Sequence, residues 1–285
     1  MIVSVITTVY NRSKFVAETI ESVLKSTLKT FEYIIVDDNS TDNSFDICQK
    51  YREQDARIKL YKNSINIGDY PNRNKAAGYA QGKYIKYVDA DDTIDPSCLE
   101  VFVSSLEQFP NCSYAVCDVP DVSENTVVNP RESYLRYFVE NKRIFQASPL
   151  TTMIRRNDFN NLNKFKEERM TSDFDMWLRL SSKYDTLLIP NKLTHYKIHK
   201  TQESSLLANS FTHKFLYHKV AENSITVHSP LERYMNETIL VRIQKNQSRL
   251  FFSALKHFKF RAALFILKKH HYNLIKVIKQ SLSPG

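Results

Sequence analysis

The sequence predicts an α/β fold in which helices flank a mostly parallel central sheet, followed by a C-terminal region made of helices. Apolar, β-branched runs alternate with stretches of helical spacing through roughly the first 90 residues. Short connections and right-handed crossovers fold such an alternation into a parallel sheet. From Phe211 onward only helical spacing recurs, which predicts the helical C-terminal region.

The first half of the chain alternates strand and helix. Strands are predicted over residues 2–9, 31–36, 58–61 and 84–88, and helices over 15–24, 41–54 and 71–80. A hydroxyl side chain that can cap the first free N–H groups precedes each of the first two helices, Ser13 for one and Ser40 or Thr41 for the other. This order predicts that the carboxyl ends of the strands meet at one edge of the sheet.

The second half is less regular. A helix is predicted over residues 99–106, a strand over 114–119, a polar loop over 120–130 and another helix over 173–180. After Pro190 the pattern weakens, and no internal repeat or low-complexity linker marks a firm domain boundary.

Composition argues against several classes of protein. At 285 residues and 42% hydrophobic, the chain can form one large core, or a core and a smaller appendage. With only four glycines, neither a GxxxxGK[ST] phosphate loop nor a GxGxxG dinucleotide turn can be written, which disfavours kinases, P-loop NTPases and ordinary NAD enzymes. The cysteines lack the spacing of a zinc site and are expected to be plain thiols: Cys48, Cys98, Cys112 and Cys117.

The net charge of +9 belongs to the C-terminal tail. All acids lie at or before Glu237 and ten basic residues follow it, so the 30 basic residues before it balance the 31 acids. In the tail the cations mingle with apolar residues. This favours either peripheral contact with an anionic membrane surface, or an appendage that packs on the core or on a second copy. Nucleic-acid binding is not expected, because no recognised module accompanies the charge.

No window approaches the roughly 18 uncharged apolar residues of a membrane-spanning helix, and no basic leader precedes the first apolar stretch. We therefore expect a cytoplasmic protein, peripheral on the inner face of the membrane if the basic tail binds lipid.

Three carboxylates follow the strand predicted over residues 84–88. Asp89, Asp91 and Asp92 would repel one another unless a cation lay among them. Hard divalent ions such as Mn²⁺ or Mg²⁺ prefer oxygen ligands of this kind. The alternative is a solvated turn in which an acid caps the following helix, and the spacing alone does not decide between the two.

Three segments resemble the successive donor-site motifs of family-2 inverting glycosyltransferases of the GT-A fold. They are SVITTVYNR, YIIVDDNSTDNS and NIGDYPNRNKAAGYAQGKYIKYVDADD, in that order, each placed at a strand end. The resemblance covers about the first 95 residues. It implies transfer of a sugar from a nucleotide diphosphate donor to a hydroxyl group.

The resemblance implies a role for each donor-site residue. Thr8, Tyr10 and Asp38 would surround the nucleobase, and Asp38 would accept a hydrogen bond from a uracil-type N–H. Arg73 would approach the base or the diphosphate, and Asp89 would lie beside the ribose. The alternatives are that Thr8 and Tyr10 are ordinary strand-end residues and that Arg73 is a solvated charge.

The metal ligands are likewise implied by the resemblance. Asp91, together with Asp92, would hold Mn²⁺ or Mg²⁺ against the diphosphate, where the metal neutralises charge on the departing nucleotide. A segment similar to the family's YRxH sequence surrounds His199, whose imidazole would reach the metal or the diphosphate. The alternative is that His199 is a surface or packing residue.

An inverting transfer needs a base that removes the proton from the acceptor hydroxyl. The segment TSDFDMWLRL resembles the family element that carries it, an [ED]D pair followed by an apolar helix ending in Arg-Leu. Asp173 takes the base position, whereas Asp175 would point away along the helix. Ser172 stands where the first acid usually lies. Ser172 or Asp173 could instead only cap the helix, and Trp177 is expected in the core.

The predicted organisation is a glycosyltransferase domain over residues 1–205 and a basic helical region over residues 206–285. Residues 1–95 would form the nucleotide-binding half of the first domain and residues 96–205 its acceptor and catalytic half. The alternatives are a catalytically silent nucleotide-sugar-binding protein, favoured by Ser172, and a nucleotidyltransferase. Donor sugar, acceptor and linkage do not follow from the sequence.

Overall fold

The computed structural model describes residues 2–142, 144–145, 147–199 and 210–269. The chain forms two compact units, one made of residues 1–137 and 141–197 and the other of residues 138–140 and 198–285. The predicted boundary at residues 205 and 206 lies outside the described residues, and it stays a prediction.

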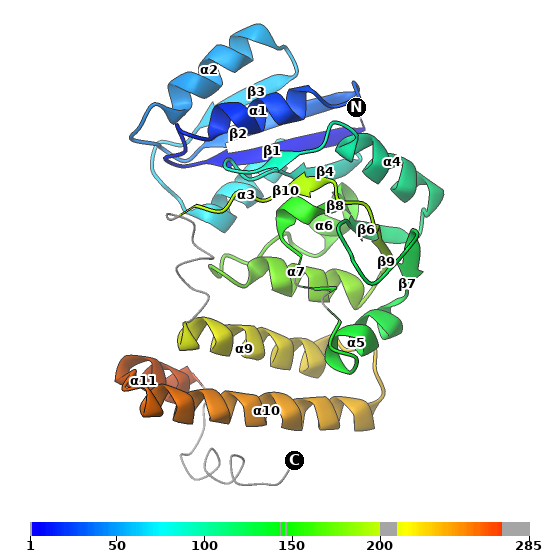
Figure 1. Cartoon of the computed structure of the whole chain (residues 1–285), viewed down its shortest axis with the longest axis vertical. Coiled ribbons are helices and arrows are strands. Elements are labelled where there is room, and N and C mark those ends of the chain that lie inside the picture. Colours follow the sequence, from blue (N-terminus) through cyan, green and yellow to red (C-terminus); the bar gives the residue numbers. More distant parts are fainter. Residues whose placement is uncertain (1, 143, 146, 200–209, 270–285) are drawn as a thin grey trace. The chain divides into compact units, whose positions relative to one another are not determined.

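The first unit is built on a mixed, mostly parallel sheet (Figure 1). Its parallel part consists of β1 (Val3–Val9), β2 (Phe31–Asp37), β3 (Ile58–Lys62) and β4 (Tyr84–Tyr87). The remaining strands are β6 (Cys112–Val116), β7 (Thr126–Val128), β8 (Thr152–Arg155) and β9 (Asp185–Leu188), and the complete order is β3-β2-β1-β4-β8-β6-β9-β7. β8 runs antiparallel to both β4 and β6. β9 pairs with β6 in parallel.

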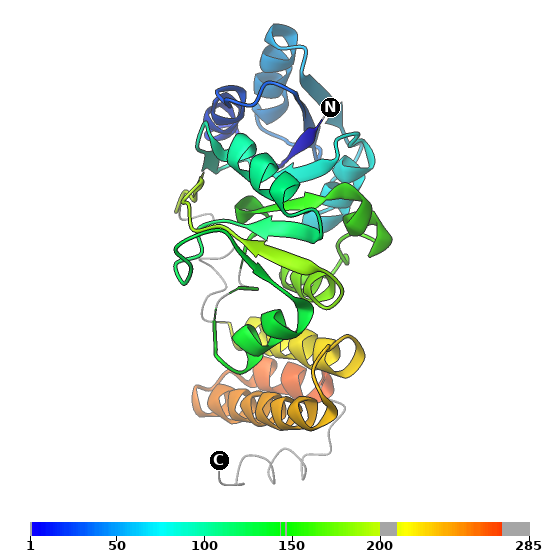
Figure 2. The same ribbon diagram turned by 90° about the vertical axis from the view of Figure 1, so that its right-hand side faces the viewer.

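Helices cover both faces of this sheet (Figure 2). One face carries α1 (Val16–Leu24), α2 (Ser44–Gln54) and α4 (Cys98–Gln108), whose apolar side chains share a single core with the strands. The other face carries α3 (Asp69–Gly78), α6 (Arg156–Asn161) and α7 (Ser172–Ser181). On that face Tyr87 contacts the rings of Phe159 and Phe165, and Phe165 in turn contacts Trp177. The predicted α/β sheet with flanking helices is therefore confirmed.

A second, two-stranded sheet lies next to the turn that follows β4. It pairs β5 (Thr93–Ile94) antiparallel with β10 (Thr194–His195), which brings the end of the first unit beside Asp92. A short 3₁₀ helix, η1 (Pro149–Thr151), leads into β8.

Two predicted helix caps and one predicted loop were wrong. The cap position of α1 is Phe15 and that of α2 is Asn43, so neither Ser13 nor Ser40 nor Thr41 caps a helix. The backbone N–H of Ser13 instead donates to Asp42, which holds the two loops together. The segment predicted as a polar loop over residues 120–130 contains β7 and ends at the first residue of α5 (Pro130–Phe138).

The second unit is helical in its described part. Its helices are α9 (Phe211–Val227), α10 (Arg233–Lys256) and α11 (Phe260–Lys269). They share a small core of their own, formed by Phe215, Phe251, Ala254, Ala263 and Ile266. None of the described helices is long and apolar enough to cross a membrane. The predicted helical C-terminal region is confirmed for residues 211–269.

All four cysteines are buried free thiols, as their spacing predicted.

Candidate active site

The carboxyl ends of β1, β2 and β4 bring distant polar residues to one edge of the sheet. β1 and β2 pair in register, Thr8 beside Val36, and the N–H of Asp38 donates to the carbonyl of Val9 at 2.7 Å. Tyr10, which follows β1, is 45% exposed, so its ring is available to a ligand at this edge.

Asp38 organises the loop that leads into α3. Its Oδ1 accepts hydrogen bonds from the Asn63 side chain at 2.7 Å and from the Ile67 N–H at 3.0 Å, and its Oδ2 accepts from the Gly68 N–H at 2.9 Å. Gly68 has a φ of 90°, a conformation that residues with a Cβ rarely adopt. The chain thus uses about three of the roughly four acceptor directions of the carboxylate and leaves one for a ligand.

Arg73 is fixed between two carboxylates. Its Nε lies 2.8 Å from Asp69, one turn earlier in α3, and its NH2 lies 2.7 Å from Asp89 beyond β4. The guanidinium also faces the rings of Tyr70 and Tyr87, with its carbon 5.9 and 5.6 Å from their centroids. Only 8% of Arg73 is exposed, which rules out the alternative that it is a solvated charge.

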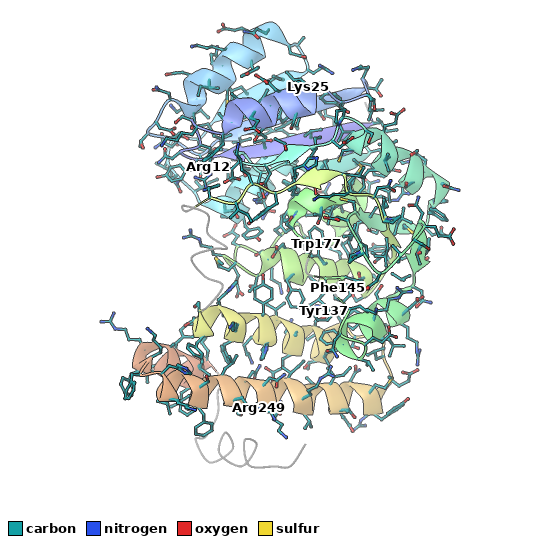
Figure 3. The ribbon with its side chains drawn as sticks, viewed as in Figure 1. Arg12, Lys25, Tyr137, Phe145, Trp177 and Arg249 are labelled. Atoms are coloured by element: carbon teal, nitrogen blue, oxygen red, sulfur yellow. The ribbon has the colours of Figure 1, made fainter. Side chains whose placement is uncertain are left out.

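Asp91 is paired with a second arginine, from the loop after β1. The Nε of Arg12 lies 2.9 Å from Asp91 Oδ2, and its NH1 donates to the carbonyls of Tyr10 and Asn11 (Figure 3 labels Arg12). Asn11 adopts a φ of 52°, a left-handed conformation that asparagine tolerates better than most residues. Sequence reasoning missed Arg12, although it lies in the first of the motifs.

Asp92 lies in the interior of the same turn. Its Oδ1 accepts from the Lys197 N–H at 2.8 Å, whereas its Oδ2 is buried without a hydrogen-bond partner among the described residues. Burial, reinforced by the charges of Asp89 and Asp91, raises the pKa of Asp92 to about 7. A carboxylate in such surroundings gains most from a cation.

The three acids of this turn fit a divalent cation only in part. The described residues contain no group of three metal-ligating side chains close enough to hold an ion by themselves. Asp89 and Asp91 are each paired with an arginine, whereas Asp92 has a buried oxygen without a hydrogen-bond partner among the described residues. Hard oxygen ligands from Asp91 and Asp92 would therefore need the oxygens of a bound diphosphate to complete the shell.

Asp173 lies in the first turn of α7 and faces α3. Its Oδ1 accepts from the Phe174 N–H at 2.8 Å. Burial raises the pKa of Asp173 to about 6, while the Phe174 N–H, the charge of Arg73 and a hydrogen bond with Tyr70 act in the opposite direction. Tyr70 and Arg73 belong to α3, so the predicted base and the predicted donor-site residues converge through that helix. Tyr70 was not anticipated from the sequence.

Asp175 has a different role from that of Asp173. Only 5% exposed, it forms ion pairs with Lys166 and Arg179, each at 2.6 Å. Arg179 also donates to the carbonyls of Leu162 and Lys164, and Ser172 donates to those of Lys166 and Glu168. These contacts fix the loop before α7. Ser172, which stands where the family usually has an acid, therefore has a structural role.

Trp177 is a core residue, as expected. Its side chain is fully buried, donates to the carbonyl of Ala147 at 2.7 Å and stacks on Tyr114. His199 belongs to the second unit, so its predicted contact with the metal stays a prediction.

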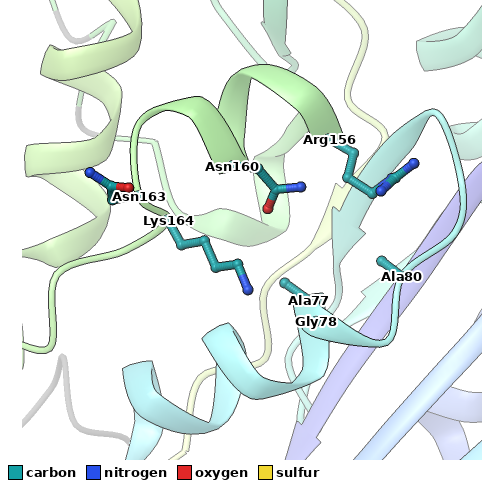
Figure 4. Close-up of a pocket in the computed structure, with 7 residues that line it drawn as sticks. All are labelled: Ala77, Gly78, Ala80, Arg156, Asn160, Asn163 and Lys164. Carbon is teal, nitrogen blue, oxygen red and sulfur yellow. The ribbon is translucent and has the colours of Figure 1, made fainter.

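A pocket of about 520 Å³ opens between the end of α3 and α6, and it includes none of the predicted site residues (Figure 4). It is lined by Ala77, Gly78, Ala80, Arg156, Asn160, Asn163 and Lys164. We place the candidate site at the carboxyl ends of the strands, because the titratable groups converge there.

Comparison with known sequences identifies the family. Residues 4–178 match the sequence profile "Glycosyl transferase family 2". An uncharacterized glycosyltransferase of Methanocaldococcus jannaschii is 33% identical over 205 residues, which cover 69% of this chain and 71% of that protein. The putative teichuronic acid biosynthesis glycosyltransferase TuaG of Bacillus subtilis is 44% identical over 91 residues, 32% of this chain and 36% of TuaG.

Solved structures share the fold. The structure of TarS from S. aureus in complex with UDP-GlcNAc superposes with a TM-score of 0.71 at 21% identity, over 86% of this chain and 72% of that one. The mannosyltransferase PcManGT from Pyrobaculum calidifontis, in complex with GDP-Man and Mn²⁺, gives 0.64 at 17% identity, over 94% and 79%. The first unit therefore has the GT-A fold. Because the family profile spans more than half of the chain, and the M. jannaschii relative aligns with more than two thirds of it, this protein belongs to glycosyltransferase family 2.

Proposed function

We propose that the protein is an inverting, metal-dependent glycosyltransferase that moves one sugar from a nucleotide diphosphate donor, UDP-linked in the first instance, to a hydroxyl of a glycan or lipid-linked acceptor. The observation that carries this proposal is the position of Arg73. This buried arginine binds Asp89 of the donor edge and lies close enough to Asp173 to lower its pKa. The donor side and the proposed base thus share one fixed cation.

In this proposal each residue has a separate task. Asp173 takes the proton from the acceptor hydroxyl as that oxygen attacks the anomeric carbon from the face opposite the nucleotide. A partly buried acid whose pKa is about 6 is ionised at neutral pH and still basic enough for this step. Tyr70 and Arg73 both lower the pKa of this carboxylate and so favour its ionised form.

The donor lies at the carboxyl ends of β1, β2 and β4, with Thr8, Tyr10 and Asp38 around the base, Arg73 toward the diphosphate and Asp89 beside the ribose. A divalent cation, Mn²⁺ or Mg²⁺, held by Asp91 and Asp92 and approached by His199, would neutralise the charge on the departing nucleoside diphosphate. Relatives of polysaccharide biosynthesis, such as TuaG, support an acceptor of that class. No segment resembles the QxxRW element of processive synthases, which favours transfer of a single sugar.

The alternatives predict different products. A silent binder would bind a nucleotide sugar without releasing any product, and a nucleotidyltransferase would release pyrophosphate. The test is to incubate the protein with Mn²⁺ and UDP-sugars or GDP-sugars plus lipid-linked acceptors, and in parallel with nucleoside triphosphates plus sugar 1-phosphates, and to measure both products. Release of nucleoside diphosphate with inversion at the anomeric carbon is the expected result. Release of pyrophosphate, or of neither product with any donor, would refute the proposal.

A further inference from the structure

The turn between α10 and α11 exposes aromatic and basic side chains together. All six residues of Lys256–Arg261 are exposed. Phe258 is 79% exposed, Phe260 is 61% exposed, and Leu264, one turn into α11, is 52% exposed. The centroids of the two phenyl rings lie 6.2 Å apart, so the rings form one apolar patch.

The backbone conformation of this turn indicates that Phe258 does not stabilise the fold. The N–H of Phe258 donates to the carbonyl of Leu255, and the N–H of Lys259 donates to that of Ala254. These two bonds end α10 in a motif whose left-handed residue is usually glycine. Phe258 occupies that position with a φ of 56°, where a bulky side chain is a genuine outlier. A strained and exposed aromatic residue points to a function at the surface.

The basic residues around the turn indicate which kind of partner the surface binds. Five basic residues of the turn and of α11 are exposed: Lys256, Lys259, Arg261, Lys268 and Lys269. No acid follows Glu237 to offset them. An exposed apolar patch that is accompanied by basic residues suits an anionic lipid surface. Aromatic side chains enter the interface of such a surface, and lysines bind its head groups. Leu264 belongs to the same patch and has no ring that could stack on a nucleic-acid base.

We propose that the α10–α11 turn inserts Phe258 and Phe260 into the interface of an anionic membrane, with the surrounding lysines and arginine bound to its head groups. This inference rests on the proposed function only in linking the surface to a lipid-linked acceptor. The binding itself requires no activity.

The test is sedimentation of the full chain with vesicles of phosphatidylcholine, with or without phosphatidylglycerol. The informative variant is Phe258→Gly, because glycine relieves the left-handed strain and the protein should fold as well as or better than the wild type. We expect this variant to bind phosphatidylglycerol vesicles roughly tenfold more weakly, since one exposed ring no longer enters the interface. Tyr234→Ser, at the other end of α10 and 67% exposed in the wild type, is the matched control and should bind normally.

Each result has one interpretation. Wild-type binding that depends on phosphatidylglycerol, falls with salt and is weakened by Phe258→Gly supports the surface. Equal binding by Phe258→Gly and wild type would overturn it, as would a dimer in solution that only this variant abolishes. Calorimetry with UDP on both proteins separates the two proposals. If vesicle binding follows the expected pattern while no nucleotide binds, the proposed function fails and the membrane surface remains.

Discussion

The turn after β4 and the first turn of α7 both carry carboxylates, but the ion pairs of these carboxylates differ. In the turn after β4, Asp89 and Asp91 are each paired with an arginine from another element. At the start of α7 the pairing falls on Asp175, and Asp173 forms no ion pair among the described residues. Acids fixed by arginines suit a rigid binding site, whereas an acid with a raised pKa suits proton transfer.

The largest effect is expected for Asp173→Asn. The amide keeps the shape of the side chain and cannot accept the proton, so turnover should fall by about 10² to 10⁴. Donor affinity measured by calorimetry should stay within about twofold of the wild type, because the role proposed for Asp173 concerns the acceptor. Normal turnover in this variant would move the base to another residue.

The pH dependence of the wild type provides a check on the same residue. The folded pKa of Asp173 is raised to about 6, so the carboxylate is protonated and inactive below that value. The turnover number should therefore rise with pH up to about 6 and then level off, unless another group limits the rate. A profile that is flat from pH 5 to 8 would contradict the assignment.

Asp175→Asn should lower the stability of the protein, whereas Asp173→Asn should lower its turnover. Removing one partner of a buried ion pair leaves Arg179 uncompensated, which costs about 3 kcal/mol of unfolding free energy. Urea unfolding of this variant and of Asp173→Asn measures the difference. We expect a large loss only for Asp175→Asn, and an equal loss in both variants would erase the distinction between the two acids.

A smaller effect on stability is expected at Asp92. The folded pKa is raised to about 7, so between pH 4 and 7 the native state binds a proton that the unfolded chain has released, and stability falls as pH rises through that window. Asp92→Asn removes this loss and should stabilise the protein by roughly 2 kcal/mol at pH 8 and very little at pH 4. Thermal unfolding at both pH values gives the comparison. A gain of equal size at both would mean that the charge of Asp92 is not the cause.

The smallest expected effect concerns Arg12, which neutralises Asp91 and so competes with a metal for that carboxylate. In the presence of UDP, Arg12→Gln should bind Mn²⁺ about tenfold more tightly, a change of about 1.4 kcal/mol. Lys25→Gln removes an exposed cation from the end of α1 and should leave Mn²⁺ affinity unchanged. Unchanged affinity in Arg12→Gln would indicate that Asp91 does not bind the metal.

The sequence predicted the regular half of the fold and the positions of the acids. β1 to β4 and their helices were predictable because segments rich in β-branched and apolar residues alternate with stretches of helical spacing. β7, β8 and β9 are only three or four residues long and depend on partners distant in sequence, so local pattern could not reveal them.

The arrangement within the site was less predictable. Arg12 and Asp91 are 79 residues apart, and Tyr70, which affects the pKa of Asp173, belongs to a different helix. Periodicity identifies which residues face one edge of the sheet, but it does not tell which of them pair. The separate roles of Asp173 and Asp175 depend on that pairing, and they became clear only from the structure.

The most direct test of the donor site is titration calorimetry of UDP and GDP into the wild type and Asp91→Ala, with Mn²⁺ or with EDTA. We expect UDP to bind the wild type in the presence of Mn²⁺, and EDTA and Asp91→Ala each to abolish this binding. If neither nucleotide binds under any condition, or if UDP binds equally in EDTA and to Asp91→Ala, the assignment of the strand-end acids as a metal-bridged donor site is contradicted.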